Sequence, residues 1–168
     1  MAKYEDLRGT EDSLLAITGH AWVFGDRITC QQLLAPEHLD MPAAVSSAFV
    51  MAGIDARFAR TVVPGDFIVA GLDFATDVTH PNVPAALKVL GIGGVIARSF
   101  GPFFLRNSIS TGLPALMVEE TGAIRGGDHL RVDIEAHIVA NLSSGDRYVI
   151  RNIDEAALVH LRRSQNER

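Results

Sequence analysis

The chain has 168 residues, 48% of them apolar and 21% charged, a composition that supports one substantial hydrophobic core but not two ordinary domains. Its net charge is -5 and lysine is scarce, so it offers no basic face to a nucleic-acid backbone. No apolar stretch approaches the roughly 20 residues that cross a bilayer, and the N-terminus lacks a basic-then-apolar secretory signal, so we expect a cytoplasmic protein that does not bind membranes.

The N-terminal third is expected to hold a short β element and short helices. Residues 1–13 are polar and aperiodic, and we expect a flexible arm there, ahead of a single domain at residues 14–168. Residues 14–24 mix apolar and β-branched side chains up to a Gly-Asp turn, which predicts one or two short strands, most simply a strand pair. Two prolines and a glycine interrupt a helical pattern in residues 35–60, so short helices are expected.

The middle of the chain alternates expected strands and helices. A compact apolar run follows a Pro-Gly-Asp turn, and two further apolar runs each follow a helical segment that ends at a glycine. Alternation at this spacing predicts an α/β fold with a parallel core sheet. The expected strands are at residues 67–70, 93–97 and 114–118, and the expected helices at 84–90 and 101–111.

The C-terminal part has a different pattern. Residues 129–140 alternate apolar and charged side chains, and residues 148–150 follow a Ser-Ser-Gly-Asp turn, which together predict an added antiparallel β element. A last helix should begin after Asn152, because Asn152 and Glu155 have the spacing of a capping box.

The polar loop at residues 74–82 is the most informative segment for function. It follows a buried strand and leads into a helix N-terminus, where backbone amides favour carboxylates or phosphates. His80 is its most versatile group, because an imidazole exchanges protons near neutral pH, although an ordinary polar turn with a solvated histidine is the alternative. The candidate site side chains of the loop are Thr76, Asp77, Thr79, His80 and Asn82.

Two arginines are further candidates for binding an acidic substrate. The guanidinium groups of Arg98 and Arg106 would fork onto a carboxylate near the cleft, while pairing with the protein's own acids is at least as common. The six histidines and the single cysteine, Cys30, show no metal-ligand spacing, so we expect no metal site within this chain. One cysteine also cannot ligate an iron-sulfur cluster.

Three strings resemble the small subunits of 3-isopropylmalate dehydratase, which are similar to the swivelling domain of aconitase. The match spans roughly residues 18–160, and its last string is the most specific. The strings are GHAWVFGD at 19–26, PGDFIVAG at 64–71, and IARSF at 96–100 followed by FLRN at 104–107 and GLP at 112–114.

This resemblance implies a β/β/α swivelling domain that closes over a large dehydratase subunit. The cysteines of that subunit hold a four-iron, four-sulfur cluster, so no cofactor is expected on this chain itself. In such enzymes the cluster iron acts as a Lewis acid on a small hydroxy-acid, and the small subunit supplies a proton-transferring serine and a carboxylate-binding arginine. The implied function is dehydration and hydration of a small hydroxy-acid, the reaction that the family performs in leucine biosynthesis.

The chain departs from the family pattern in the loop that should perform the chemistry. The family loop is glycine-rich, with two serines followed by arginine, glutamate and histidine; here Val78 takes the place of the first serine, Thr79 of the second and His80 of the arginine. Valine cannot carry a proton, so Thr79 and His80 become the candidate catalytic residues, and Thr76, Asp77, Asn82, Arg98 and Arg106 the candidate substrate-binding residues.

A second departure lies upstream, where residues 29–32 (TCQQ) replace a family string that contains two carboxylates. Histidine in place of arginine weakens carboxylate binding by about 1.5–3 kcal/mol, which argues against unchanged 3-isopropylmalate chemistry. Three outcomes fit: a hydro-lyase with another substrate in which Thr79 or His80 takes the proton, a small subunit that only shapes the site, or a different local alignment. A rival of another class is a non-catalytic anion-binding or regulatory module with the same fold.

Residues 39–53 correspond to the loop that covers the substrate in relatives. Their small side chains predict a lid, with a plain surface helix as the alternative.

Overall fold

The computed structural model describes residues 15–77 and 80–167. The expected N-terminal arm at residues 1–13 lies outside the described residues, as do Val78 and Thr79 of the polar loop.

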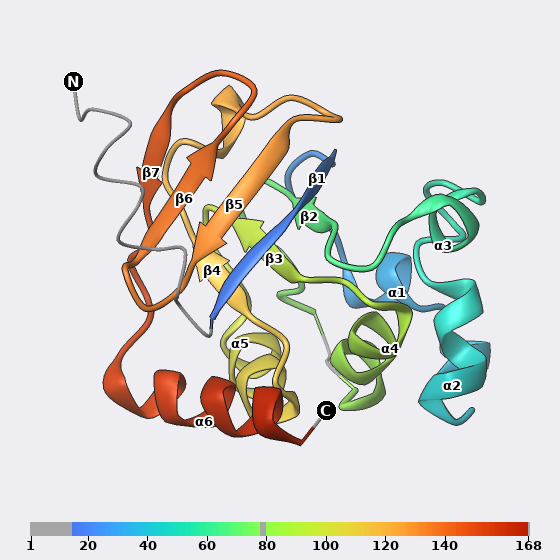
Figure 1. The fold of residues 1–168 in the computed structure, drawn as a ribbon. Helices are drawn as coiled ribbons and strands as arrows, with labels where there is room; N and C mark the ends of the chain where they lie inside the picture. Colours follow the sequence, from blue (N-terminus) through green and yellow to red (C-terminus); the bar gives the residue numbers. More distant parts are fainter. Residues whose placement is uncertain (1–14, 78–79, 168) are drawn as a thin grey trace.

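Four parallel strands form one half of a seven-stranded sheet (Figure 1). Their order across the sheet is β4-β3-β2-β1, which confirms the expected parallel α/β core. The three shorter strands, β2, β3 and β4, are apolar because helices and the curled remainder of the sheet bury both of their faces. The bounds are β1 (Ala16–Val23), β2 (Phe67–Val69), β3 (Gly94–Ala97) and β4 (Ala115–Met117).

Three antiparallel strands extend the sheet on the other side of β1, as the alternating C-terminal pattern predicted. They are β5 (His129–Asp133), β6 (Ile138–Asn141) and β7 (Arg147–Val149), in the order β1-β5-β6-β7. The expected strand pair at residues 14–24 is wrong, because this segment forms the single strand β1 and the chain then continues into a helix instead of returning.

β1 takes part in both halves of the sheet. Its last three residues pair in parallel with β2, and its first five pair antiparallel with β5. Gly19 pairs with Leu130 in the antiparallel part, two residues before the parallel pairing begins, and a Cβ atom on Gly19 would lie 2.1 Å from the carbonyl oxygen of Gly65. Only glycine therefore allows the backbones to approach this closely.

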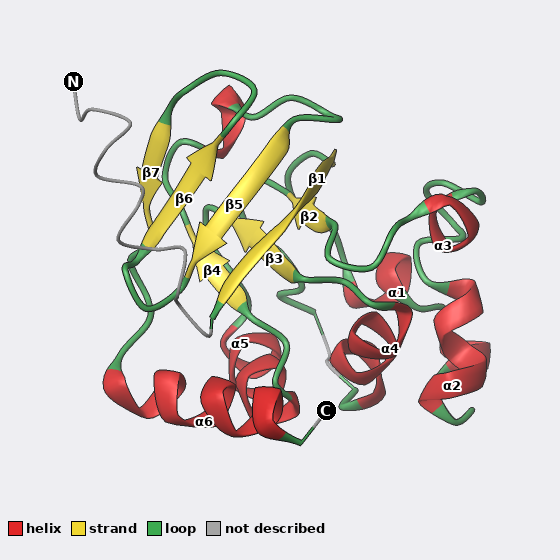
Figure 2. Ribbon diagram, in the orientation of Figure 1, coloured by secondary structure: helices red, strands yellow, loops and turns green. Residues whose placement is uncertain are grey.

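Helices cover the parallel sheet (Figure 2). The alternation of side chains along its strands divides the core in two. Ile68 points into a cluster with α1, α3, α4 and α5, whereas Phe67 and Val69 point into a second cluster with α6 and the antiparallel strands. The helices are α1 (Cys30–Leu33), η2 (Pro36–His38), α2 (Ala43–Ser46), η3 (Ser47–Phe49), α3 (Phe58–Thr61), α4 (Asn82–Leu90), α5 (Pro102–Thr111), η4 (Thr121–Ala123) and α6 (Glu155–Asn166).

The N-terminus of α6 differs from the prediction. Its N-cap is Asp154, whose carboxylate accepts a hydrogen bond from the N–H of Ala157. Asn152 is instead used for tertiary structure: its side chain accepts from the N–H of Met117 and donates to the carbonyl oxygen of Ala115. The capping box assigned to Asn152 is therefore wrong, because the asparagine holds β4.

Candidate active site

The carboxyl ends of β1 to β4 meet at one edge of the sheet, the position at which open α/β sheets bind ligands. A cavity of about 450 Å³ lies at this edge, a size suited to a small metabolite. We call it the edge cavity. Its walls include Gly25, Asp26, Gly71, Arg98, Glu119 and Thr121.

The polar loop leaves this edge after β2 and is held to the segment that follows β1. The N–H of Arg27 donates to the carbonyl oxygen of Leu72 (2.8 Å), and the N–H of Ala75 donates to that of Ile28 (2.7 Å). These bonds involve only main-chain groups. The path of the loop therefore does not depend on its own side chains at these points.

The same loop is held from its other side by the segment after β3. The N–H of Phe74 donates to the carbonyl oxygen of Ser99 (3.0 Å), and the N–H of Gly101 donates to that of Phe74 (2.8 Å). The hydroxyl of Ser99 accepts from the N–H of Asp73 (2.7 Å). Ser99 is thus a positioning residue that sequence analysis missed, although it lies within the IARSF string.

Two glycines and three strained residues accompany this close packing. A Cβ atom on Gly71 would lie 1.8 Å from Asp26 Oδ1, and one on Gly101 would lie 2.2 Å from the carbonyl oxygen of Ala75. Arg27, Asp73 and Ala75 adopt left-handed backbone conformations, with φ values of 55°, 58° and 56°. Strained backbone of this kind is concentrated at functional sites.

Asp77 anchors the end of the described part of the loop. Its Oδ1 accepts a hydrogen bond of 2.7 Å from the N–H of Cys30, the first residue of α1. Thr76 beside it is exposed. The structure therefore gives Asp77 a structural contact, while its predicted role in substrate binding, like that of Thr76, stays a prediction. Thr79 lies outside the described residues.

His80 and Asn82 meet at the start of α4. The Nδ1 atom of His80 accepts a hydrogen bond of 3.1 Å from the N–H of Asn82. The side-chain Nδ2 of Asn82 faces the carbonyl oxygens of Leu39 (3.0 Å) and Met41 (2.8 Å) and the hydroxyl of Ser46 (3.3 Å). Asn82 therefore holds residues 39–46 against the first turn of α4.

The contacts of Asn82 place the segment that was expected to form a lid against the first turn of α4. The segment at residues 39–53, which we call the lid segment, is built from the short helices α2 and η3 and adjoining turns, and not from one plain surface helix. A hollow of about 550 Å³ lies where it meets the loop. We call it the lid hollow. Its walls are Leu39, Asp40, Met41, Pro42, His80, Pro81, Asn82 and Ala85.

The two candidate arginines lie in different places. Arg98 is exposed and lines the edge cavity. Arg106 lies on α5, with its guanidinium carbon 5.3 Å from the ring centre of Phe103, and lines a separate hollow between α5 and α6. Arg98 therefore lies at the carboxyl edge of the parallel strands. Arg98 and Arg106 do not line the same cavity.

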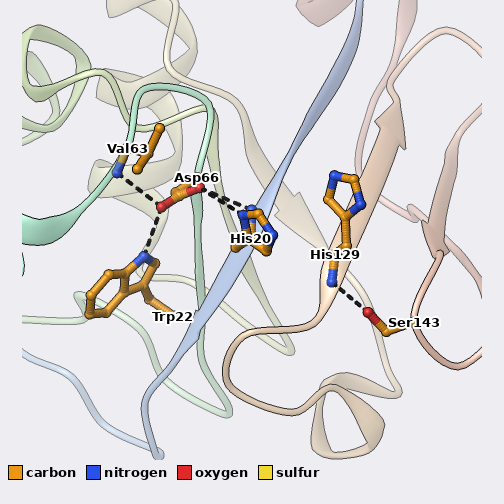
Figure 3. A network of polar contacts seen from close by, with 6 residues as sticks. All are labelled: His20, Trp22, Val63, Asp66, His129 and Ser143. Atoms are coloured by element: carbon orange, nitrogen blue, oxygen red, sulfur yellow. Dashed lines mark hydrogen bonds and ion pairs between the residues drawn. The ribbon is translucent and has the colours of Figure 1, made fainter.

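A buried acid beside β1 was also missed by sequence analysis (Figure 3). Asp66 accepts hydrogen bonds from the N–H groups of His20 and Val63 and from the indole of Trp22, each 3.0 Å long. Burial by itself would raise the pKa of Asp66, but these hydrogen bonds together hold the pKa below its ordinary value. Its position in the Pro-Gly-Asp turn before a buried strand was the available signal.

Within residues 15–77 and 80–167, no group of three or more histidine, cysteine or acidic side chains is arranged to hold a metal ion. Cys30 is buried, at 3% exposure, inside the same core cluster as Ile68. The residue therefore does not lie at the surface of this chain.

Comparison with known proteins supplies the family. No family model matches the chain. The 3-isopropylmalate dehydratase small subunit of Wolinella succinogenes is 38% identical over 136 residues, which cover 80% of this chain and 81% of that protein. The chain belongs to the family of 3-isopropylmalate dehydratase small subunits. The isopropylmalate/citramalate isomerase small subunit of Methanocaldococcus jannaschii is 36% identical over 132 residues, 77% of this chain and 79% of that one.

A solved structure agrees with this assignment. The crystal structure of 3-isopropylmalate dehydratase from Methanocaldococcus jannaschii superposes with a TM-score of 0.81 at 26% identity, and the match covers 90% of this chain and 96% of that one. The aconitase-type fold expected from the sequence is thereby confirmed. As a member of the dehydratase small-subunit family, the present chain is a hydro-lyase subunit. None of the described helices is both long and apolar enough to span a membrane.

Proposed function

We propose that this chain completes the active site of a two-subunit hydro-lyase for a small hydroxy-acid other than 3-isopropylmalate. The observation that carries the proposal is that the altered loop is still hydrogen-bonded on both sides at the carboxyl edge of the parallel strands. A loop that had lost its function would not need Ala75 and Asp73 in strained conformations.

The partner in this proposal is a large subunit that carries an iron-sulfur cluster, whose iron supplies Lewis-acid chemistry at the substrate hydroxyl. Family membership supports a large subunit, because the relatives are named small subunits. The single buried cysteine is consistent with a cluster held entirely by that partner.

The residues of this chain bind and orient the acid. Arg98 at the edge cavity offers a guanidinium fork for a carboxylate, and Thr79 or His80 serves the proton transfer. Without the family arginine at position 80 the site binds that carboxylate more weakly, which favours a different substrate. The relative named for both isopropylmalate and citramalate indicates that the family accepts more than one hydroxy-acid.

The test is reconstitution under anaerobic conditions with a cluster-bearing large subunit, followed by assay with 2-hydroxy and 3-hydroxy dicarboxylates. We expect turnover of one of them faster than 3-isopropylmalate, and loss of turnover in at least one of the variants Thr79→Ala and His80→Ala. Asn107→Ala on α5 is the matched control. Unchanged turnover in both loop variants would remove the catalytic assignment. Tight dicarboxylate binding without turnover would support the non-catalytic module instead.

A further inference from the structure

The hydrogen bond between His80 and Asn82 determines which nitrogen of the imidazole carries the proton. Nδ1 of His80 accepts from a main-chain N–H, and a main-chain N–H can only donate. The accepting nitrogen must be unprotonated, so the neutral ring holds its proton on Nε2. To act as a base, the ring would have to give up its bond to the first turn of α4.

The contacts of Asn82 also fix the orientation of its side-chain amide. Leu39 and Met41 present carbonyl oxygens to it, and these only accept hydrogen bonds. The amide nitrogen therefore faces the lid segment, since the flipped amide would set its oxygen against two other oxygens. Ser46, which receives the third contact, is fully buried, so the contact lies inside the packed part of the lid.

One residue thus has contacts on two sides. The backbone of Asn82 holds the ring of His80, while its side chain holds the lid segment. His80, Asn82 and Met41 all border the lid hollow. We propose that Asn82 is a positioning residue that couples the lid segment to His80, and that His80 meets an anionic substrate oxygen as an Nε2–H donor. This proposal rests on the proposed function for the nature of the ligand, and it gives His80 a binding role, leaving proton transfer to another group.

The tautomer is measured on the isolated full-length chain. Nitrogen-15 NMR of histidine-labelled protein at mildly alkaline pH, where imidazole rings are neutral, distinguishes the two tautomers, and the signal absent from His80→Asn is that of residue 80. We expect the Nε2–H form to predominate. A predominant Nδ1–H form, or an even mixture, would overturn the proposal.

The coupling is measured with Asn82→Ala by hydrogen exchange. The amides of Val45 and Ser46, which both donate to the carbonyl oxygen of Pro42 within the lid segment, should exchange about tenfold faster. The His80 signal should move towards a mixture of tautomers. Asn107→Ala on α5, a change of the same size away from the lid, should alter neither. Exchange that is unchanged in Asn82→Ala would contradict the coupling.

The binding role is measured on the reconstituted enzyme with two substitutions. His80→Gln keeps an N–H donor near the position of Nε2, whereas His80→Asn keeps an acceptor near Nδ1 but offers no distal donor. We expect the KM of His80→Gln to stay within about threefold of the original and that of His80→Asn to rise about tenfold, with similar kcat. A fall in kcat of about a hundredfold or more in both would identify His80 as a base and overturn the proposal. If no large subunit supports turnover, the proposed function fails while the NMR and exchange results still test the coupling.

Discussion

The carboxylate of Asp77 and the backbone N–H of Cys30 lie 2.7 Å apart, so the polar loop and the first turn of α1 are joined by one side chain. Two segments 47 residues apart in sequence are held in register by this bond. A carboxylate at a helix N-terminus also interacts favourably with the main-chain dipoles there.

Removal of the Asp77 carboxylate should destabilise the contact between the polar loop and the first turn of α1. We expect Asp77→Ala to lower the free energy of unfolding by about 1 kcal/mol, the usual value of an N-terminal cap. The amides of α1 should exchange faster by a corresponding factor. Urea unfolding with Glu37→Gln, an exposed acid, as the control measures the first effect, and a stability equal to the original would refute the anchoring role.

Arg27 offers a test of backbone strain at the edge. Its φ of 55° is unfavourable for any residue with a Cβ, and its side chain is exposed. Arg27→Gly should therefore raise the free energy of unfolding by about 0.5–1 kcal/mol. Arg60→Gly, within α3, should lower it by a similar amount, because there glycine only weakens a helix. Thermal melts of the pair measure the contrast, and a loss of stability in both would argue against strain at residue 27.

The close approach of β1 to the turn before β2 makes Gly19 intolerant of substitution. A methyl group there would overlap the carbonyl oxygen of Gly65, so Gly19→Ala should cost more than about 2 kcal/mol or prevent folding. At Gly53 no atom lies within 4 Å of an added Cβ, and Gly53→Ala should be neutral or slightly stabilising. Soluble yield and Tm measure both, and a normal Tm for Gly19→Ala would show that the strands can separate there.

Asp66 should make stability depend on pH in the acid range. Its pKa in the folded protein is below its ordinary value of 3.8, so the folded state binds fewer protons than the unfolded chain there. The stabilisation is present above that ordinary value and is lost as the pH falls through the lower folded value.

Asp66→Asn isolates this contribution. Its amide group would set a donor against the N–H groups of Trp22 or Val63, so we expect a loss of about 1–3 kcal/mol near neutral pH. The difference from the original protein should shrink below about pH 3.8. Urea midpoints across this range measure it; a difference that stays constant with pH would mean that ionisation of Asp66 is irrelevant to stability.

Local patterns in the sequence predicted the elements that apolar runs and terminal glycines mark out. The strand β3 and the helix α5 were located within one residue, because apolar runs and terminal glycines define them. The strand pair assigned to residues 14–24 failed, since the partners of β1 are β2 and β5, far away in sequence.

The site was harder to predict for the same reason. The loop was identified correctly as the segment beside a helix N-terminus, but the contacts of Asn82 reach residues 36 to 43 positions away. The capping box of Thr29 and Gln32 was likewise noticed only as a departure from the family string. Hydrogen bonds between distant segments leave no periodic trace in a sequence.

Most of the bonds that fix residues 72–75 run from main chain to main chain, and this has an evolutionary consequence. Mutations in the loop can replace its side chains without displacing the peptide groups that set its course. New selectivity can therefore arise at this edge while the scaffold around it stays intact.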